Sequence, residues 1–101
     1  MGPQLLDATG KTACIIGAAG GIGRATLAMM QSCGARIIAM DLPGSTRPDM
    51  GPEDIWYDLD CSDEEAVTSV FADLASNSVT IDYLVNAAGI TGHGAISEIT
   101  L

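Results

Sequence analysis

The stretch Thr12-Ala13-Cys14-Ile15-Ile16-Gly17-Ala18-Ala19-Gly20-Gly21-Ile22-Gly23 decides the fold. Its first part, residues 12–16, is a short and mostly apolar run, which is typical of a strand buried on both faces of a parallel sheet. Glycines follow at once, and a helical stretch then runs from Ile22 to Ser32, with Gly34 placed to end it. This order of strand, glycine-rich turn and helix predicts the first unit of a parallel α/β sheet.

Further strands are expected downstream, at Arg36–Met40, Ile55–Leu59 and Ile81–Val85. The first of these strands runs directly into Asp41. The stretch 42–54 that follows is rich in proline and glycine, which leaves no room for a helix of normal length. Trp56 and Tyr57 are adjacent strand residues, so we expect them to face opposite sides of the sheet.

A second helix is expected between the third and fourth strands. Ser62 and Glu65 have the spacing of a capping box, with Ser62 as the N-cap. Behind them, one apolar helical face is formed by Ala66, Val67, Val70, Phe71 and Leu74. In the first helix the apolar residues that recur at helical spacing are Ile22, Ala25, Leu27, Ala28 and Met29. Met29 and Met30 are both expected to serve in helix packing.

Composition limits the classes of function. A chain of 101 residues, 48% apolar and 17% charged, is enough for one small domain with a packed core. The net charge of −9 argues against binding nucleic acid through a basic face. No apolar run is long enough to span a membrane, and the first residues lack signal-peptide features. The odd number of cysteines, Cys14, Cys33 and Cys61, without metal-site spacing, favours small hydrophobic roles in a reducing, cytoplasmic location.

The glycine spacing G-x-x-x-G-x-G has a physical use. Glycines permit a tight turn, let the backbone approach a pyrophosphate, and let the helix pack close to the strand. The helix N-terminus then stabilises the phosphates. An ordinary strand-to-helix turn is the alternative reading. Asp41, at the end of the next strand, favours a dinucleotide site because a carboxylate there can accept hydrogen bonds from an adenosine ribose.

At this loop the chain resembles the short-chain dehydrogenase/reductase family, whose loop reads T-G-x-x-x-G-x-G. The three family glycines correspond to Gly17, Gly21 and Gly23. Ile16 stands where threonine is usual, which removes a hydroxyl that would tie the loop down but leaves the glycine geometry unchanged.

Two later segments carry the same resemblance, which covers essentially the whole chain. Residues 60–63, Asp-Cys-Ser-Asp, are similar to the family's Asp-Val-Thr/Ser-Asp segment, whose first two residues contact the adenine ring. Residues 86–89, Asn-Ala-Ala-Gly, resemble its Asn-Asn-Ala-Gly segment after the fourth strand. The resemblance implies an α/β fold with a Rossmann-type doubly wound parallel sheet. Residues 1–101 would form only its first half, a NAD-binding half-domain of four strands in the order 3-2-1-4.

The resemblance also implies which residues bind the cofactor. They are Gly17, Ala19, Gly20, Gly21, Ile22, Gly23, Asp41, Leu42, Asp60, Cys61, Asn86, Ala87, Ala88 and Gly89. NAD is expected rather than NADP, since a 2′-phosphate beside Asp41 would bring like charges together. Leu42 stands where NADP sites often have a basic residue. Arg47 is the nearest candidate cation, in a loop from which it could swing in.

No catalytic residue is expected within the chain. The family's Tyr-x-x-x-Lys pair is absent, because Cys61 follows Tyr57 by four residues, Ala87 follows Tyr83 likewise, and the one lysine is Lys11. We therefore expect the 101-residue chain, alone, to be inactive and poorly folded, with a bare fourth strand. No metal is expected either. His93 has no second ligand at metal-site spacing, and the acids between 53 and 65 are read mostly as a solvated surface with helix N-terminal acids.

Several functions remain open at this point. The favoured one is the cofactor-binding part of an NAD-dependent oxidoreductase that transfers hydride between nicotinamide and an alcohol or carbonyl substrate. The alternatives are a non-catalytic dinucleotide-binding module and a nucleoside-cofactor methyltransferase. Gly17, Gly21 and Gly23, with the segment 86–89, favour the first two. A small-molecule substrate is the expected partner, with no nucleic acid and no membrane, and the complete protein would be able to form a homo-oligomer.

Overall fold

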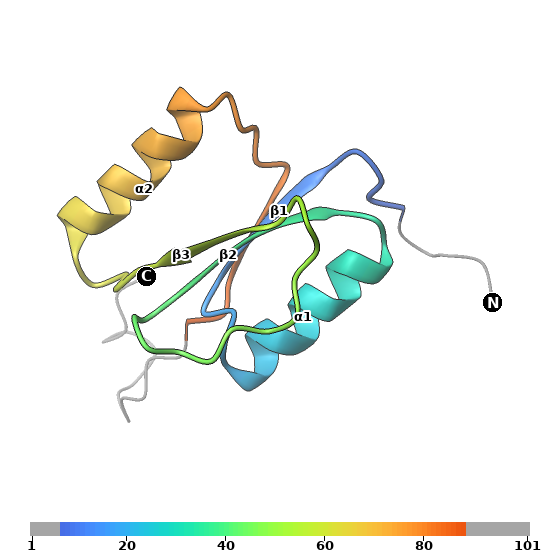
Figure 1. Cartoon of the computed structure of the whole chain (residues 1–101), viewed down its shortest axis with the longest axis horizontal. Helices are drawn as coiled ribbons and strands as arrows, with labels where there is room; N and C mark the ends of the chain where they lie inside the picture. Colours follow the sequence, from blue (N-terminus) through green and yellow to red (C-terminus); the bar gives the residue numbers. More distant parts are fainter. Residues whose placement is uncertain (1–6, 89–101) are drawn as a thin grey trace, which may run out of the picture.

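The computed structural model describes residues 7–88, which form a four-stranded parallel sheet with one helix on each face (Figure 1). The sheet has the order β3-β2-β1-β4. This confirms the expected α/β class and the strand order 3-2-1-4. In chain order the elements are β1 (Thr12–Ile16), α1 (Gly21–Ser32), β2 (Arg36–Asp41), β3 (Ile55–Asp58), α2 (Glu64–Ser76) and β4 (Tyr83–Asn86).

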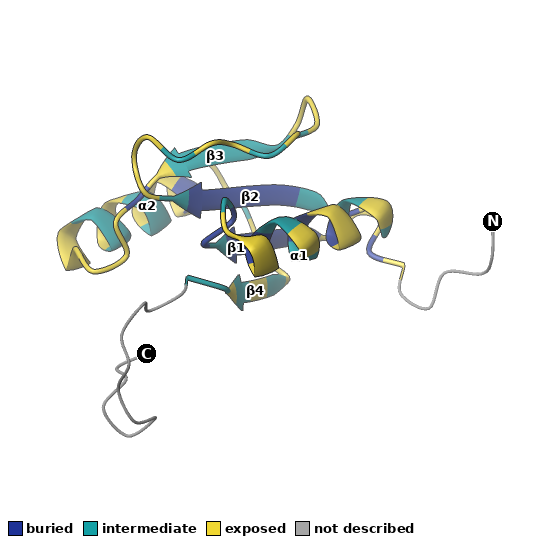
Figure 2. Cartoon of the chain, turned by 90° about the horizontal axis from the view of Figure 1, so that it is seen from below, coloured by how far each residue is buried: buried dark blue, intermediate teal, exposed yellow. Residues whose placement is uncertain are grey.

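Two hydrophobic clusters cover the two faces of the sheet. On the α1 face, Ile15 and Ile37 pack with Leu27 and Met30 of the helix. On the α2 face, Cys14, Ile38, Met40, Leu59 and Leu74 form the second cluster. Trp56 packs against the first cluster and Tyr57 against the second, so the expectation that they face opposite sides is confirmed. β1 and β2 are therefore buried on both sides, whereas β3 and β4 are half-exposed (Figure 2).

Only part of the apolar set expected for α1 faces the sheet. Leu27 and Met30 are buried, three residues apart on one side of the helix. Ile22 and Met29 are seven residues apart and lie on the other side, where 76% and 54% of their surfaces are exposed. The prediction that Met29 serves in helix packing was therefore wrong, whereas the same prediction for Met30 is confirmed. The helix ends as expected at Gly34, whose φ of +94° is a left-handed conformation that glycine adopts without strain.

The N-cap of α2 is Asp63, not Ser62. The Asp63 carboxylate accepts hydrogen bonds from the amides of Glu65 (3.1 Å) and Ala66 (3.2 Å). The Ser62 hydroxyl instead donates to Asp60 at 2.6 Å. The capping-box prediction was therefore wrong by one residue, because Asp60 takes the Ser62 side chain away from the helix. The predicted apolar face of α2 is confirmed, since all five of its residues pack in the second cluster.

Replacing Asp63 with alanine is expected to destabilise the protein by about 1 kcal/mol, because the first-turn amides of α2 lose their acceptor. Ser62→Ala is the matched control one residue earlier and is expected to cost less than about 0.5 kcal/mol, the usual limit for a surface change. Urea unfolding of both variants measures the difference. A larger loss for Ser62→Ala than for Asp63→Ala would contradict the assignment of the cap.

Two acids tie down the ends of strands. The Asp54 carboxylate accepts from the amides of Ile37 (2.8 Å) and Gly51 (2.7 Å), which fixes the end of the 42–54 loop against β2. The Asp82 carboxylate accepts from the Thr12 amide at 2.9 Å, at the start of β1. The expectation that the acids near residue 54 form a mainly solvated surface therefore understates their structural role.

β4 lies at the edge of the sheet. It pairs with β1 from Ala13↔Tyr83 to Ile16↔Asn86, so it begins and ends later than the expected Ile81–Val85. Leu84 is 60% exposed, and no strand within residues 7–88 pairs with the outer side of β4. In the same part of the chain, no helix is long and apolar enough to cross a membrane.

Candidate functional site

A pocket of about 410 Å³ lies where the carboxyl ends of β1, β2 and β4 meet. This is the edge at which open parallel sheets bind ligands. The pocket brings together a majority of the predicted cofactor residues, namely Gly17, Gly20, Asp41, Leu42, Asp60, Cys61, Ala87 and Ala88. Ile16, Leu59 and Ser62 complete its lining. Five predicted residues do not line it, namely Ala19 in the glycine loop, Gly21, Ile22 and Gly23 at the start of α1, and Asn86 at the end of β4. Gly89 and His93 lie outside the described residues.

Two of the glycines are required by packing. A Cβ on Gly23 would lie 1.9 Å from the carbonyl oxygen of Gly17, so no side chain fits where α1 meets the loop. Gly17 has φ +82°, and a Cβ there would lie 2.5 Å from the amide nitrogen of Ala88. Ala88, Gly17 and Gly23 therefore form a close backbone stack that joins the end of β4, the glycine loop and α1.

The other two glycines leave open space. A Cβ on Gly21 would meet no atom within 4 Å, and one on Gly20 would make only an ordinary contact at 3.6 Å. Both residues are exposed. The fold therefore does not need glycine at these two positions, and their missing side chains leave the backbone accessible to a ligand.

The N-terminus of α1 is uncapped. Gly20 is its N-cap, without a side-chain hydrogen bond, and the first turn contains no acid. α2 differs in both respects, with the Asp63 cap and with Glu64 and Glu65 in its first turn. No acceptor within residues 7–88 pairs with the amides of residues 21–23. These free donors and the positive end of the helix dipole favour an anion at this end of the pocket.

Asp41 connects β2 to the glycine loop. Its Oδ2 accepts from the Ala19 amide at 2.9 Å, and its Oδ1 accepts from the Leu42 amide at 2.8 Å. Each carboxylate oxygen keeps a lone pair for a further hydrogen bond. The side chain is therefore fixed in orientation while it can still accept from a hydroxyl in the pocket.

Sequence reasoning missed Arg24. Its Nε donates to the Ala19 carbonyl at 3.0 Å, and its Nη2 donates to the Thr46 carbonyl. Arg24 thus joins the glycine loop to the 42–54 loop from the first turn of α1. Its position directly after Gly23, the last glycine of the motif, is the signal in the sequence that marks it.

The 60–63 segment forms the far wall of the pocket. The Asp60 carboxylate accepts from both the hydroxyl (2.6 Å) and the amide (3.0 Å) of Ser62. These two hydrogen bonds hold the pKa of Asp60 below its usual value. Cys61 is exposed at the pocket, unlike Cys14, whose burial raises its thiol pKa to about 11. The expectation that the cysteines act as small hydrophobes therefore holds for Cys14 and is wrong for Cys61.

The segment after β4 closes the pocket beside the glycine loop. The Ala87 amide donates to the Ile16 carbonyl at 2.8 Å, which extends the pairing of β1 with β4. The Asn86 Oδ1 accepts from the Ala88 amide at 3.1 Å, which turns the chain back over Gly17. The backbone of Ile16 therefore holds this turn without a threonine hydroxyl.

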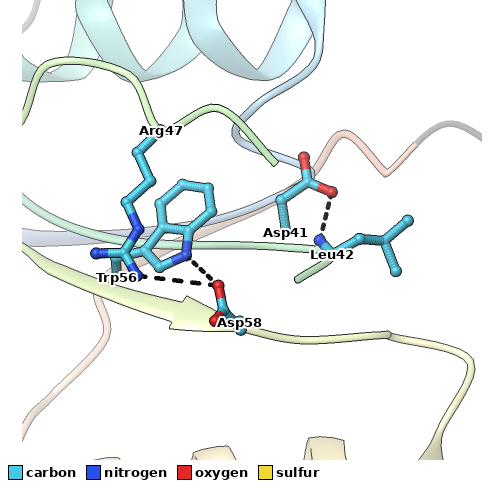
Figure 3. A network of polar contacts seen from close by, with 5 residues as sticks. All are labelled: Asp41, Leu42, Arg47, Trp56 and Asp58. Carbon is cyan, nitrogen blue, oxygen red and sulfur yellow. Dashed lines mark hydrogen bonds and ion pairs between the residues drawn. The ribbon is translucent and has the colours of Figure 1, made fainter. Parts of the chain in front are cut away.

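Arg47 lies near the carboxyl end of β2, where Asp41 is, but its guanidinium contacts Trp56 and Asp58 of β3 (Figure 3). Its Cζ lies 5.3 Å from the centroid of the Trp56 ring, and its Nη2 lies 4.0 Å from the Asp58 Oδ1. Trp56 Nε1 donates to the same oxygen at 2.9 Å. Arg47 is therefore not directed into the pocket.

Tyr57 makes a polar contact between β3 and α2. Its hydroxyl donates to the Asp73 Oδ2 at 2.6 Å. Burial, this hydrogen bond and the Asp73 charge together raise the pKa of Tyr57 to about 12 from 10.0. The pKa of Tyr57 is higher in the folded protein than in the unfolded chain. The stability that the protonated phenol contributes is therefore complete below pH 10 and is lost as the pH rises through about 12.

We expect Asp73→Asn to lower the pKa of Tyr57 without returning it to 10.0, because burial is the largest cause and remains. Phenolate absorbance against pH measures the midpoint, in a Tyr83→Phe background where Tyr57 is the one remaining tyrosine. An unchanged midpoint after Asp73→Asn would show that the hydrogen bond to Asp73 has no influence on the phenol.

A larger pocket, of about 680 Å³, lies at the opposite end of the sheet, around Lys11, Arg36 and Glu53. It contains no predicted site residue. Within residues 7–88, no group of three or more histidine, cysteine, aspartate or glutamate residues could hold a metal ion.

Comparisons with known proteins agree with the geometry. Residues 11–101 match the family model for short chain dehydrogenase. A sorbitol dehydrogenase of Cereibacter sphaeroides is 36% identical over 95 residues, which are 90% of this chain and 37% of that protein. A human 3-oxoacyl-[acyl-carrier-protein] reductase is 32% identical over 90 residues, which are 85% of this chain and 38% of the relative. The chain thus spans well under half the length of these relatives.

Solved structures share the fold. A short chain dehydrogenase from Leptospira borgpetersenii, with bound NAD+, matches with a TM-score of 0.72 at 24% identity, over 94% of this chain and 36% of that one. The aldohexose dehydrogenase of Thermoplasma acidophilum matches with a TM-score of 0.68 at 26% identity, over 96% and 35% of the two chains. The four-stranded sheet and its two helices therefore correspond to about a third of each of these larger proteins.

Proposed function

This chain belongs to the short chain dehydrogenase family, and we propose that it supplies the NAD-binding part of an oxidoreductase that transfers hydride between nicotinamide and an alcohol or carbonyl substrate. The family match removes the methyltransferase alternative. It leaves two functions to be distinguished, a complete enzyme and a dinucleotide-binding module without catalysis.

The single observation that carries the proposal is that unpaired helix amides and a carboxylate lie at the same pocket. The uncapped start of α1, with free amides and open space at Gly20 and Gly21, lies beside a carboxylate at Asp41. The first group favours a pyrophosphate and the second favours ribose hydroxyls. A dinucleotide presents both groups, so one ligand would satisfy both ends of the pocket.

The residues fit the proposed ligand in a definite arrangement. The amides of Gly21, Ile22 and Gly23 would bind the pyrophosphate, and Asp41 would orient the adenosine ribose. Leu42, Asp60 and Cys61 would enclose the adenine, while residues 86–88 would lie toward the nicotinamide. When bound, the nicotinamide supplies hydride chemistry, and the described residues bind and orient it.

The tyrosine–lysine pair that the family uses for proton transfer does not occur in these 101 residues. None of the tyrosines in the chain is followed four residues later by lysine. A tuned tyrosine is the family's general acid–base. Whether the reading frame encodes Ser and Tyr-x-x-x-Lys after residue 101 therefore decides between the enzyme and the module. We infer a small-molecule substrate and a cytoplasmic location, the latter supported by three free cysteines, one of them exposed.

The binding test uses the full product of the reading frame. NAD at a hundredfold excess over its Kd is expected to stabilise the protein by about 2.7 kcal/mol, and S-adenosylmethionine is expected to have no effect. Gly21→Ala is expected to leave the fold intact and to weaken NAD binding about tenfold or more, because a methyl group would obstruct hydrogen bonds to a charged phosphate. Thermal unfolding and calorimetric titration measure the two effects.

The outcomes separate fold from binding. A Gly21→Ala protein that unfolds at the wild-type temperature and binds NAD as tightly as wild type would contradict the pyrophosphate position. Stabilisation by S-adenosylmethionine but not by NAD would overturn the proposed cofactor.

A further inference from the structure

Arg47 is held one strand away from Asp41. Asp58, its ion-pair partner, is the register partner of Asp41 in the β2–β3 pairing. Trp56, beneath the guanidinium, pairs with Ala39 and packs on the α1 face. Asp58 follows Trp56 by two residues and Asp41 follows Ala39 by two, so both carboxylates lie on this same face. The cation is thus close to the ribose end of the pocket but bound to a different acid (Figure 3).

The loop that carries Arg47 is joined to the glycine loop through Arg24. Thr46, the residue before Arg47, accepts a hydrogen bond from Arg24, which also holds Ala19. Arg24 and Arg47 are two of only four basic residues in the whole sequence. Two guanidinium groups therefore flank the position where a ribose would meet Asp41, and both are already bound to groups of the protein.

We propose that Asp58 and Trp56 form a latch on Arg47, and that this latch sets how strongly the pocket discriminates against a dinucleotide carrying a 2′-phosphate. The inference rests on the proposed function. A 2′-phosphate at Asp41 needs a cation to offset the repulsion between like charges. Arg24 is already held by two backbone carbonyls, so Arg47 is the cation that we assign to this role, and it meets the phosphate only by leaving the Asp58 carboxylate and the Trp56 ring.

The contacts that form the latch are weak enough for a ligand to break them. The Arg47 and Asp58 side chains are 60% and 51% exposed, so water and salt screen their attraction. The arginine also stacks over an aromatic ring, which adds a comparable contribution. Contacts of this size change an affinity by about fivefold rather than a thousandfold. The latch therefore adjusts a preference whose main source is Asp41.

The experiment is a double-mutant cycle on the full product of the reading frame. Asp58→Asn, Arg47→Gln and the double variant are titrated with NAD+ and with NADP+, and the ratio of the two Kd values is compared. Asp58→Asn is expected to improve relative NADP+ affinity about fivefold. In the Arg47→Gln background the same change is expected to have less than a twofold effect, because no arginine is left to release. The cycle thus separates the latch from the general loss of one negative charge.

Trp56 provides a second readout, since it is the one tryptophan in the sequence. Its emission is expected to change more with NADP+ than with NAD+ when Arg47 is present, and equally when it is not. An Asp58→Asn gain that persists without Arg47, or no gain at all while NAD+ still binds, would overturn the latch alone. Failure of the wild-type protein to bind NAD+ would overturn the proposed function, and the latch with it.

Discussion

Replacing Gly23 with alanine is expected to destabilise the protein by about 3 kcal/mol or more, which is the upper range for overpacking a well-packed site. The added Cβ would lie 1.9 Å from the Gly17 carbonyl oxygen and 2.9 Å from the Ala18 Cα. Both are backbone atoms, so no side-chain rotation relieves the clash. α1 has to move away from the loop or the loop has to open. In thermal unfolding of the full product of the reading frame, the melting temperature should fall by about 6 °C or more.

Gly21→Ala is the matched control for this prediction. It makes the same chemical change two residues earlier, at a position where a Cβ meets nothing within 4 Å. Its melting temperature should stay within about 3 °C of the wild type, since a surface change of this kind costs less than about 0.5 kcal/mol. Equal destabilisation by the two alanines would show that glycine is needed at both positions for backbone conformation, and that the close approach of Gly23 to Gly17 is not the cause.

The second large effect concerns the choice between NAD and NADP. Asp41→Ser with Leu42→Arg is expected to weaken NAD binding about tenfold to a hundredfold, because hydrogen bonds to a charged acceptor contribute about 1.5–3 kcal/mol. NADP binding should strengthen, since a repelling carboxylate is replaced by an attracting guanidinium at an exposed position. Titration of the full product of the reading frame with both cofactors measures the preference, which should reverse.

The control is Glu65→Ser with Ser69→Arg on the exposed surface of α2, which changes the net charge by the same amount. It should leave the ratio of the two affinities nearly unchanged, because neither residue lines the pocket and exposed charges are screened by water and salt. Tighter binding of NADP than of NAD by the unmodified protein would refute the role of Asp41 as the ribose acceptor. A similar shift in the control would attribute the effect to net charge.

Much of the fold could be predicted because its strongest signals are local. The run 12–16 and the glycines after it define a buried strand and a turn without reference to distant residues. Which side of α1 faces the sheet was harder to predict from the sequence. Ile22, Leu27, Met29 and Met30 supply apolar residues on more than one side of α1, and the close approach of Gly23 to the loop selects the side with Leu27 and Met30.

The cap of α2 illustrates a second limit. Ser62 and Asp63 are both good N-cap residues and stand next to each other. The choice depends on Asp60, whose carboxylate occupies the Ser62 hydroxyl and leaves Asp63 to meet the helix amides. Competition between neighbouring hydrogen bonds is decided by backbone geometry, which a residue pattern does not contain.

The pocket was predictable to the extent that strand ends converge. Asp41 ends β2, Asp60 and Ala87 come shortly after β3 and β4, and parallel strands place such residues at one edge of the sheet. The contacts of Arg24 and Arg47 were not predictable, because they depend on the path of the irregular 42–54 loop. Neither hydrophobic periodicity nor motif spacing determines that path.

The close stack of Ala88 on Gly17 has a consequence for the order in which the protein is made. β1 and β4 are neighbours in the sheet, yet they are separated by 70 positions in the chain, as between Thr12 and Asp82. Contacts across such separations form later than local ones. A nascent chain that has emerged only as far as β2 carries all four glycines of the loop but not the turn that holds Gly17 in place. The pocket proposed to bind the cofactor is therefore complete only after the fourth strand has left the ribosome.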